Sequence, residues 1–382
     1  MDVYLSRVRT FQKNLQGKAE AAFFPVSADM QYLTGVQRPF PNFGAVHHPG
    51  EWLEGVWVGA KGDPIITLTR MSSELSGVGH EAGIEKRILG DWDDPFSAVD
   101  SVLSQLGARK AGKVAIGDAT SGESVVAISG LLPGVSFVSG TEILASQRRI
   151  KSAAEIDIMR QAGEVTEAAF EAVLQSLKHG MTELDVISEV DLQLRRRGAR
   201  GPSFTTSLYC SGPDHPLIHG QPEQTLNRRL DPPVAVLFDF GAIFQGYCYD
   251  FGRTVFFGEP DDEMAEIHRL VMASQSAGIE ALKAGAAKAE TADAAARQVI
   301  EQAGFGEAFR HRLGHGIGLD VHEAPFLTAG DTTILQAGML FTVEPSITQH
   351  AGFSARVEDV VVVGEEGGTP LTRSHPELIV VG

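Results

Sequence analysis

A chain of 382 residues is long enough for two domains, because single domains usually span about 100–200 residues. Its hydrophobic fraction of 43% and charged fraction of 21% are typical of a globular protein and exclude a disordered or fibrous one. The formal net charge of −17 argues against nucleic acid or an anionic membrane as the main partner, since both bind basic surfaces. The basic cluster at residues 195–200 closes an expected helix, where cations complement the helix dipole.

The sequence also indicates a compartment. Cys210 and Cys248 are the two cysteines, too few for a disulfide framework or a thiolate metal site. The N-terminus has no apolar core of signal-peptide type, and no run approaches the roughly 18–20 apolar residues that a membrane helix needs. We therefore expect a reduced, cytoplasmic protein.

Residues 1–148 predict an N-terminal domain of the α/β class. Short apolar runs alternate there with amphipathic stretches, which is typical of a sheet covered by helices. The expected strands are residues 21–24, 55–60, 64–69 and 113–118.

A second domain is predicted for residues 149–382, and it opens with two helices. Ser152 with Glu155 forms a capping box that starts the first helix. Thr182 with Asp185 starts the second helix in the same way. The expected elements are helices from Ser152 to Gly180 and from Thr182 to Gly198, then a strand pair at 233–242 and 247–258.

The same order of elements recurs later in this domain. The Leu-Lys-x-Gly sequence at 177–180 returns 105 residues later, at 282–285. Asp239 and Glu344 are separated by the same interval. Two matching offsets indicate a duplicated half-domain, so we expect two similar α/β halves around a shared sheet. The repeated elements are helices at 262–284 and 290–303 and a strand pair at 338–347 and 354–363.

Two acids are expected to face each other in the first strand pair. Asp239 and Asp250 are equidistant from a turn centred just after Phe244. Directly opposite residues of such a hairpin have Cβ atoms about 4.5–5.5 Å apart. Their neighbours are mainly apolar, so both carboxylates are predicted to lie in a largely buried sheet.

Glu344 and Glu358 repeat this arrangement around Ala351 in the second strand pair. Like charges across a ladder destabilise it, and buried carboxylates are costly unless they are paired or bound to metal. One alternative is that each acid pairs with a nearby arginine, such as Arg253 or Arg356. Two arginines offset two acids, whereas four converging acids need the charge of two divalent cations.

The stretch HRLGHGIGLDVHEAP, residues 311–325, is rich in histidine and glycine and suits neither a helix nor an ordinary strand. A surface loop with solvated histidines is one alternative. In the metal interpretation, His315 supplies the nitrogen ligand beside the four carboxylates. Such a ligand set favours Mn, Fe or Co, with Zn possible. Two ions that share carboxylates would sit about 3.5–4 Å apart and could activate a water between them.

Four sequence runs occur in one order along residues 149–382, namely DFG…YCYDFGRT, HRLGHGIGLDVHEAP, FTVEP and ARVED. Together they resemble the pita-bread metallopeptidases, and specifically the prolidase and aminopeptidase P branch. Residues 1–148 are similar in length and pattern to the N-terminal domain of that branch. The resemblance implies an α/β (α+β) fold, with a creatinase/prolidase-like domain at 1–148 and a pseudo-two-fold pita-bread catalytic domain at 149–382.

The resemblance also implies a set of metal ligands. Asp250 and Glu358 would bridge two divalent ions, and Glu344 would double as the proton acceptor for the water between them. The implied ligands are Asp239, Asp250, His315, Glu344 and Glu358.

Further residues are implied to meet the substrate. His322 would contact the scissile amide and help stabilise the developing oxyanion. His219 matches the substrate-contacting histidine upstream of the first strand pair, and His215 competes for the same role. Arg356 would organise the site or meet a substrate carboxylate.

The sequence departs from the family pattern at positions that bear on loop shape and specificity. Ser346 and Ala355 stand where the family commonly has glycine, and the segment before Asp239 is slightly longer than usual. His311 and His350 have no matched role and are expected at the surface.

The resemblance implies a cytoplasmic homodimer that uses two metal ions, with Mn as the first candidate, to hydrolyse the peptide bond before proline. The expected activity is that of an Xaa-Pro dipeptidase, in which the N-terminal domain of the same or a partner subunit blocks the site beyond the second residue. The alternatives are an Xaa-Pro aminopeptidase acting on longer peptides, a metal-dependent lyase, a creatinase-like amidinohydrolase and a non-catalytic binding module. A creatinase-like enzyme dispenses with the metals and a binding module would have lost ligands, so five intact ligands disfavour both.

Overall fold

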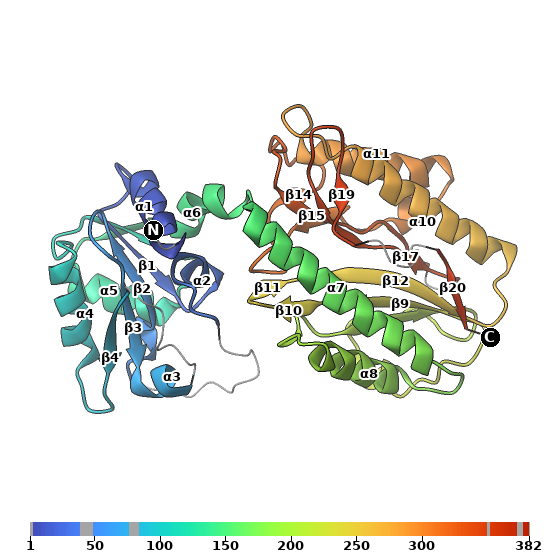
Figure 1. The fold of residues 1–382 in the computed structure, drawn as a ribbon, viewed down its shortest axis with the longest axis horizontal. Coiled ribbons are helices and arrows are strands. Elements are labelled where there is room, and N and C mark those ends of the chain that lie inside the picture. The colour runs from blue at the N-terminus through green and yellow to red at the C-terminus, as the bar shows by residue number, and fades with distance from the viewer. Residues whose placement is uncertain (1–2, 39–48, 76–83, 350–351, 373–376, 382) are drawn as a thin grey trace. The chain divides into compact units, whose positions relative to one another are not determined.

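The computed structural model describes residues 3–38, 49–75, 84–349, 352–372 and 377–381 (Figure 1). The chain forms two compact units, Met1–Arg148 (unit 1) and Arg149–Gly382 (unit 2). Within the described ranges, every helix is too short or too polar to cross a bilayer.

Unit 1 is built on a six-stranded sheet in the order β4-β3-β2-β1-β5-β6. Four of its strands match the expected ones, whereas the sequence pattern did not predict β4 and β6. Three of the five residues of β4 are charged, and β6 has only four residues, so neither shows a clear apolar run. The strands are β1 (Ala21–Pro25), β2 (Gly55–Gly59), β3 (Ile65–Thr69), β4 (Glu85–Leu89), β5 (Lys113–Ile116) and β6 (Ser136–Ser139).

The helices of unit 1 pack beside this sheet and complete its core. Val102 and Ile128 of two helices lie in one buried cluster with Phe23 and Trp57 of the sheet. The helices are α1 (Val3–Leu15), α2 (Ala28–Thr34), η1 (Glu51–Leu53), α3 (Arg70–Leu75), α4 (Pro95–Gln105), α5 (Gly122–Leu131) and α6 (Gly140–Arg148).

The first half of unit 2 opens with two capped helices, as the sequence predicted. Ser152 and Thr182 each form a full capping box, which fixes where the helices begin. The ring of Phe170 then packs the first helix against Phe238 and Phe251 of the sheet, with centroids 5.4 and 5.3 Å away. The elements are α7 (Ala153–Ser176), α8 (Glu183–Arg196), β7 (Gly201–Pro202), β8 (Ser207–Ser211), α9 (Pro222–Thr225), β9 (Val234–Phe240), β10 (Ala242–Phe244), β11 (Tyr247–Cys248) and β12 (Phe251–Phe257).

The second half repeats this plan. Its two long helices lie side by side (Figure 1), and Val271 and Ile300 share a buried core with Phe341 and Val361 of the strands. The elements are α10 (Asp262–Glu280), α11 (Ala289–Gln302), η2 (Gly306–Ala308), β13 (Gly314–Gly316), β14 (Glu323–Leu327), β15 (Leu340–Val343), β16 (Ser346–Ile347), β17 (Ala355–Arg356), β18 (Asp359–Val362), β19 (Thr369–Pro370) and β20 (Ile379–Val381).

The strand pairs of the two halves do not join in one continuous sheet, contrary to the sequence prediction, although β20 from the second half adds to the main sheet of the first half. The described strands of unit 2 form separate sheets in the orders β20-β12-β9-β8, β11-β10-β7, β14-β13-β15-β18-β19 and β16-β17. An isolated bridge between Gly252 and Glu358 links the first half to the second. The halves therefore meet at Glu358, a predicted ligand, and two residues from Asp250, another predicted ligand.

Candidate metal centre

The two acids of the first strand pair are not directly opposite each other, contrary to the prediction. Gln245 and Gly246 form the tight turn with φ of 48° and 85°, one residue later than expected. Positive φ at both positions is the geometry of the turns that suit the twist of a hairpin. The ladder therefore pairs Asp239 with Gly252, and Asp250 takes a diagonal position on the same face.

Glu344 and Glu358 keep the expected register. The β15–β18 pairs and the β16–β17 pairs on either side of them share one register, which sets the two glutamates across from each other. Ala351, the expected centre of the connection, lies outside the described residues. The N–H of Glu358 also donates to the carbonyl of Gly252 at 2.9 Å, so this strand pair is tied to the first one.

The histidine- and glycine-rich stretch holds a short irregular strand rather than a surface loop. Its register shifts just after His315, which marks a bulge in β13. A Cβ on Gly314 would lie 1.9 Å from the carbonyl oxygen of Thr342, and one on Gly316 would lie 2.6 Å from that of Glu323. Glycine is required at both positions because the neighbouring strands leave no room for a side chain.

His315 is buried with 1% of its surface exposed, which rules out a solvated ring. Its Nδ1 lies 3.0 Å from the carbonyl oxygen of Gly316, and because a carbonyl only accepts, Nδ1 carries the ring proton. The lone pair of Nε2 then faces Asp250 Oδ2 at 3.6 Å and Glu344 Oε1 at 3.4 Å. Burial lowers the pKa of His315 to about 3, so Nε2 stays unprotonated near neutral pH. A cation held between these electron-rich atoms would offset their mutual repulsion.

Asp250 and Glu358 add two buried oxygens that lack a hydrogen-bond partner, Asp250 Oδ1 and Glu358 Oε2. Burial, followed by repulsion from neighbouring carboxylates, raises the pKa of both groups well above their usual range. With His315 they offer ligand atoms that all lie within 4.8 Å of one another. A divalent cation fits this group, because it would satisfy the two oxygens and favour the ionised carboxylates.

Glu344 and Asp239 extend the group on the side of Arg356. Burial raises the pKa of Glu344 to about 7, although Arg356 opposes that shift. Asp239 accepts a hydrogen bond from Arg356 Nη1 at 2.6 Å, and the same nitrogen lies 3.7 Å from Glu344 Oε2. The side chains of all five predicted ligands therefore gather in one region of unit 2.

Pairing with arginine accounts for only part of this negative charge. Arg253 forms its ion pair with Asp359, at 2.6 Å, and Asp359 is not one of the predicted ligands. Arg356 pairs with Asp239. Neither arginine donates to the two partnerless oxygens of Asp250 and Glu358, so the arginine alternative does not explain the group.

His322 lies against the ligand histidine. The two rings, His315 and His322, pack edge to face with centroids 4.1 Å apart, and His322 is exposed to solvent. Burial, assisted by the charge of Arg312, lowers the pKa of His322. The ring is therefore neutral near pH 7 and can donate one N–H to a bound group.

The surroundings of His215 and His219 differ, and these are the two candidates for the substrate-contacting histidine upstream of the first strand pair. His215 is buried, and its Nε2 lies 2.9 Å from the carbonyl oxygen of Arg229, so its ring contacts the backbone of the segment between β8 and β9. His219 is exposed, with its ring 4.9 Å from that of Tyr209. Burial first, and then the charge of Arg356, lowers the pKa of His219. Of the two, His219 has the side chain available to a ligand.

His311 is not a surface residue, contrary to the prediction. Its half-buried ring places Nε2 2.5 Å from Ser346 Oγ and 3.5 Å from Arg356 Nη2. Sequence spacing gave no signal for this contact, because it depends on the β16–β17 pairing that sets Ser346 opposite Arg356. His350 lies outside the described residues.

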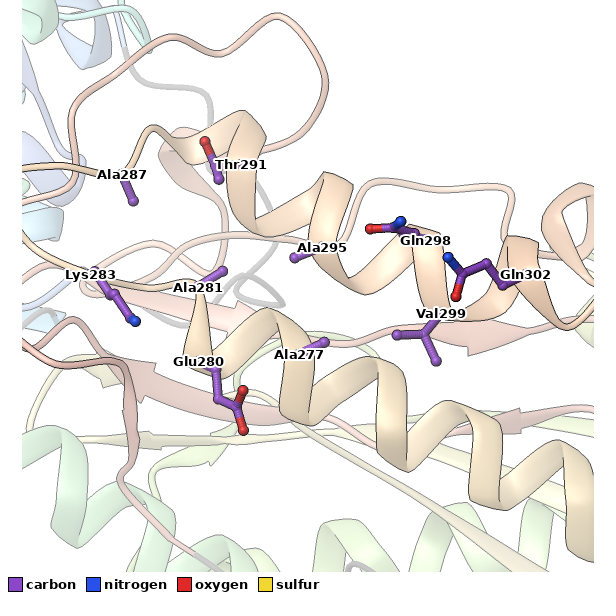
Figure 2. Close-up of a pocket in the computed structure, with 10 residues that line it drawn as sticks. All are labelled: Ala277, Glu280, Ala281, Lys283, Ala287, Thr291, Ala295, Gln298, Val299 and Gln302. Carbon is purple, nitrogen blue, oxygen red and sulfur yellow. The ribbon is translucent and has the colours of Figure 1, made fainter.

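A hollow of about 540 Å³ lies between α10 and α11 (Figure 2). Small and polar side chains line it, among them Ala277, Lys283 and Gln298. None of its described lining residues belongs to the predicted site. The candidate centre is therefore the buried group between the two strand pairs and not this hollow.

Known proteins resemble this chain over most of its length. An uncharacterized peptidase of Staphylococcus aureus is 31% identical, covering 93% of this chain and 95% of that one. An Xaa-Pro dipeptidase of Lactobacillus delbrueckii subsp. lactis is 37% identical, covering 63% and 64%. Among solved structures, an Xaa-Pro dipeptidase of Bacillus anthracis has a TM-score of 0.84 at 28% identity, covering 99% and 100%. An X-Pro aminopeptidase of Thermotoga maritima has a TM-score of 0.81 at 27% identity, covering 97% and 99%.

The duplicated fold and the buried acid–imidazole group together define a metal-dependent peptidase. The profile of metallopeptidase family M24 matches residues 157–365, which contain every predicted ligand. The chain belongs to metallopeptidase family M24.

Proposed function

We propose that this chain is an Xaa-Pro dipeptidase that uses two metal ions to hydrolyse the peptide bond before proline. The observation that carries the proposal is the neutral His315 ring, whose Nε2 lone pair faces two buried carboxylates. The fold and family support a peptidase, and the similarity to the Xaa-Pro dipeptidases of Lactobacillus and Bacillus supports the Xaa-Pro substrate.

Five side chains would hold the two ions. Asp250 and Glu358 would hold them with the two oxygens that lie buried between the strand pairs without a hydrogen-bond partner. Four carboxylates and one imidazole form a hard ligand set, which favours Mn over the thiophilic metals, with Co, Fe and Zn as alternatives. The ions, when bound, supply Lewis acidity toward the substrate carbonyl and toward the attacking water. The proposed ligands are Asp239, Asp250, His315, Glu344 and Glu358.

The remaining steps belong to side chains of this chain. Glu344 would accept a proton from the attacking water and return it to the proline nitrogen as the bond breaks. His322 would donate its N–H to the carbonyl oxygen while negative charge develops there. His219 would contact the substrate, and Arg356 would keep Asp239 in place.

The proposed substrate is a dipeptide with proline in the second position. Proline forms a tertiary amide without an N–H, so general peptidases that need that donor cleave the bond poorly. We further propose a homodimer in a reduced cytoplasmic compartment. The two cysteines, Cys210 and Cys248, are buried, and burial raises the pKa of the Cys210 thiol well above its usual range. A thiol of that kind is little ionised and therefore unreactive.

An Xaa-Pro aminopeptidase is the second candidate. The Thermotoga X-Pro aminopeptidase supports it, because its fold matches this chain over almost the whole length of both. The two activities differ in the length of the peptide accepted beyond proline.

One panel of substrates tests both candidates. Turnover would be measured with added Mn on Xaa-Pro dipeptides, Xaa-Pro-Yaa tripeptides and dipeptides without proline. We expect Xaa-Pro dipeptides to be cleaved much faster than the tripeptides. Equal or faster cleavage of the tripeptides would assign the aminopeptidase activity instead, and cleavage of dipeptides regardless of proline would refute both.

A further inference from the structure

Arg356 stands between two of the proposed ligands and is largely buried, with 13% of its side chain exposed. Its Nη1 donates to Asp239 Oδ2 at 2.6 Å and lies 3.7 Å from Glu344 Oε2. The orientation of the guanidinium plane therefore helps to set where the Asp239 carboxylate points. A contact on the other terminal nitrogen would further restrict the rotation of this planar group.

His311 meets the other end of this guanidinium. Its Nδ1 lies 2.7 Å from the carbonyl oxygen of Arg312, and since that oxygen only accepts, Nδ1 carries the proton. The Nε2 atom then accepts, and it receives the hydroxyl hydrogen of Ser346 at 2.5 Å. Arg356 Nη2 lies 3.5 Å from the same Nε2 atom.

The position of the His311 ring is itself fixed from two sides. Arg297 of α11 donates to the carbonyl oxygen of His311 at 2.8 Å, and the ring packs edge to face on Phe309 with centroids 5.3 Å apart. On the other side, Ser346 is buried and is the cross-strand neighbour of Arg356. Ser346, His311 and Arg356 thus form a continuous chain of contacts that ends on Asp239.

We infer that Ser346 and His311 are positioning residues, which hold the Arg356 guanidinium toward Asp239 and Glu344. The inference rests on the proposed function, because it takes Asp239 and Glu344 as ligands. Loss of either positioning residue would let the guanidinium turn and would release the Asp239 carboxylate from its orientation. Outer partners that orient metal ligands have this kind of effect on affinity.

The test compares variants of the whole chain after the metal has been stripped. Mn²⁺ affinity is measured by calorimetry, together with kcat, KM and the melting temperature. We expect His311→Leu, which removes the acceptor at similar volume, to weaken Mn²⁺ binding about 10- to 100-fold. His311→Gln keeps a distal acceptor and should stay within about threefold of wild type. Ser346→Ala removes one donor and should weaken binding about 3- to 10-fold.

A double variant separates positioning from simple packing. Arg356→Lys alone should weaken Mn²⁺ binding, and adding His311→Leu should weaken it no further, because both changes break one chain of contacts. His268→Leu is the matched control, because His268 is a buried histidine on α10 that takes no part in these contacts. This variant should leave Mn²⁺ affinity unchanged.

Two results would overturn the inference. One is wild-type Mn²⁺ affinity in His311→Leu, and the other is a double variant whose losses multiply. Failure of the proposed function would look different, because wild type would bind Mn²⁺ but cleave no Xaa-Pro peptide. The Mn²⁺ titrations of the variants would still decide the positioning roles in that case.

Discussion

His315 and His322 lie in one short stretch of sequence but have different surroundings. The first is buried with its Nε2 atom toward carboxylates, whereas the second is exposed and touches the first through its ring. We expect His315→Ala to lose at least one metal ion and nearly all activity. His322→Ala should keep its metal and lose about 10²–10³ in kcat, the usual effect of removing one oxyanion donor.

Bound metal and kcat measured together on both variants check this assignment. If His322→Ala emptied the centre while His315→Ala kept both ions, the two roles would be exchanged. If neither variant lost activity, the stretch would have no catalytic part.

Gly252 is a second residue whose identity bears on the centre. A Cβ there would lie 2.9 Å from Glu358 Oε2 and 3.0 Å from Glu358 Cβ. Gly252→Ala should therefore displace the carboxylate of Glu358, a proposed ligand, and weaken metal binding by at least the roughly 10- to 100-fold that disturbed ligand orientation costs. Gly112→Ala is the control, because a Cβ on Gly112 would meet nothing within 4 Å. Equal Mn²⁺ affinity in the two variants would show that the close approach does not matter.

At the scale of elements, the turn between β13 and β14 carries His322 and is anchored by a buried ion pair. Lys151 Nζ lies 3.1 Å from Glu323 Oε2, with the side chains 4% and 8% exposed. The other oxygen, Glu323 Oε1, accepts from the N–H of Asp320 at 3.1 Å. One carboxylate thus joins the start of unit 2 to the turn that carries His322.

Glu323→Ala should leave Lys151 buried and unpaired, which destabilises a fold by about 3–5 kcal/mol. It should also lower kcat while metal content stays near wild type, because His322 and not a ligand is displaced. Chemical denaturation, kcat and elemental analysis measure these effects. Glu290→Ala in the more exposed Lys288–Glu290 pair is the control and should change stability by less than about 1 kcal/mol. A Glu323→Ala variant with wild-type kcat would show that the anchor does not position His322.

At the scale of the whole molecule, bound metal should contribute to stability as well as to activity. A ligand that binds only the folded state stabilises it by about 3 kcal/mol at 100 times its Kd. Prolonged chelation should therefore lower the melting temperature and abolish turnover. Mn or Co should restore both better than Mg, because Mg gives up its bound waters reluctantly. Normal turnover by the fully stripped protein would contradict a metal-dependent mechanism.

The folded state should also lose stability in mild acid through His268. Burial lowers the pKa of this side chain to about 4, and the charge of Arg253 acts in the same direction. The unfolded chain, with a histidine pKa near about 6.5, binds a proton that the folded state refuses. Stability should therefore fall as pH decreases from 6.5 toward 4, by up to about 3 kcal/mol from this group.

His268→Leu should show a smaller loss of unfolding free energy between pH 7 and pH 5 than wild type. Denaturant titrations at both pH values measure the difference. Part of the slope should remain, because burial also lowers the pKa values of His311 and His315 to about 4 and about 3. An identical slope in wild type and variant would exclude His268 as a source of acid sensitivity.

Much of this protein could be predicted from the sequence because the signals are local. The capping boxes at Ser152 and Thr182 fix where two helices begin, and the structure confirms both. The spacing of Glu344 and Glu358 gave the register of the second strand pair. The ordered motifs gave the family, since ligand types recur at set positions along the chain. Each of these features depends on residues within one element or one hairpin.

Tertiary structure alone decided the features that join distant segments. The sequence placed the first turn one residue too early, because two consecutive positive φ values at Gln245 and Gly246 are not evident from spacing. It also placed His311 at the surface, although Ser346 and Arg356 contact it from 35 and 45 residues away. Contacts of this kind exist only after the strand pairs have packed, because no local pattern records which side chains of separate strands will meet.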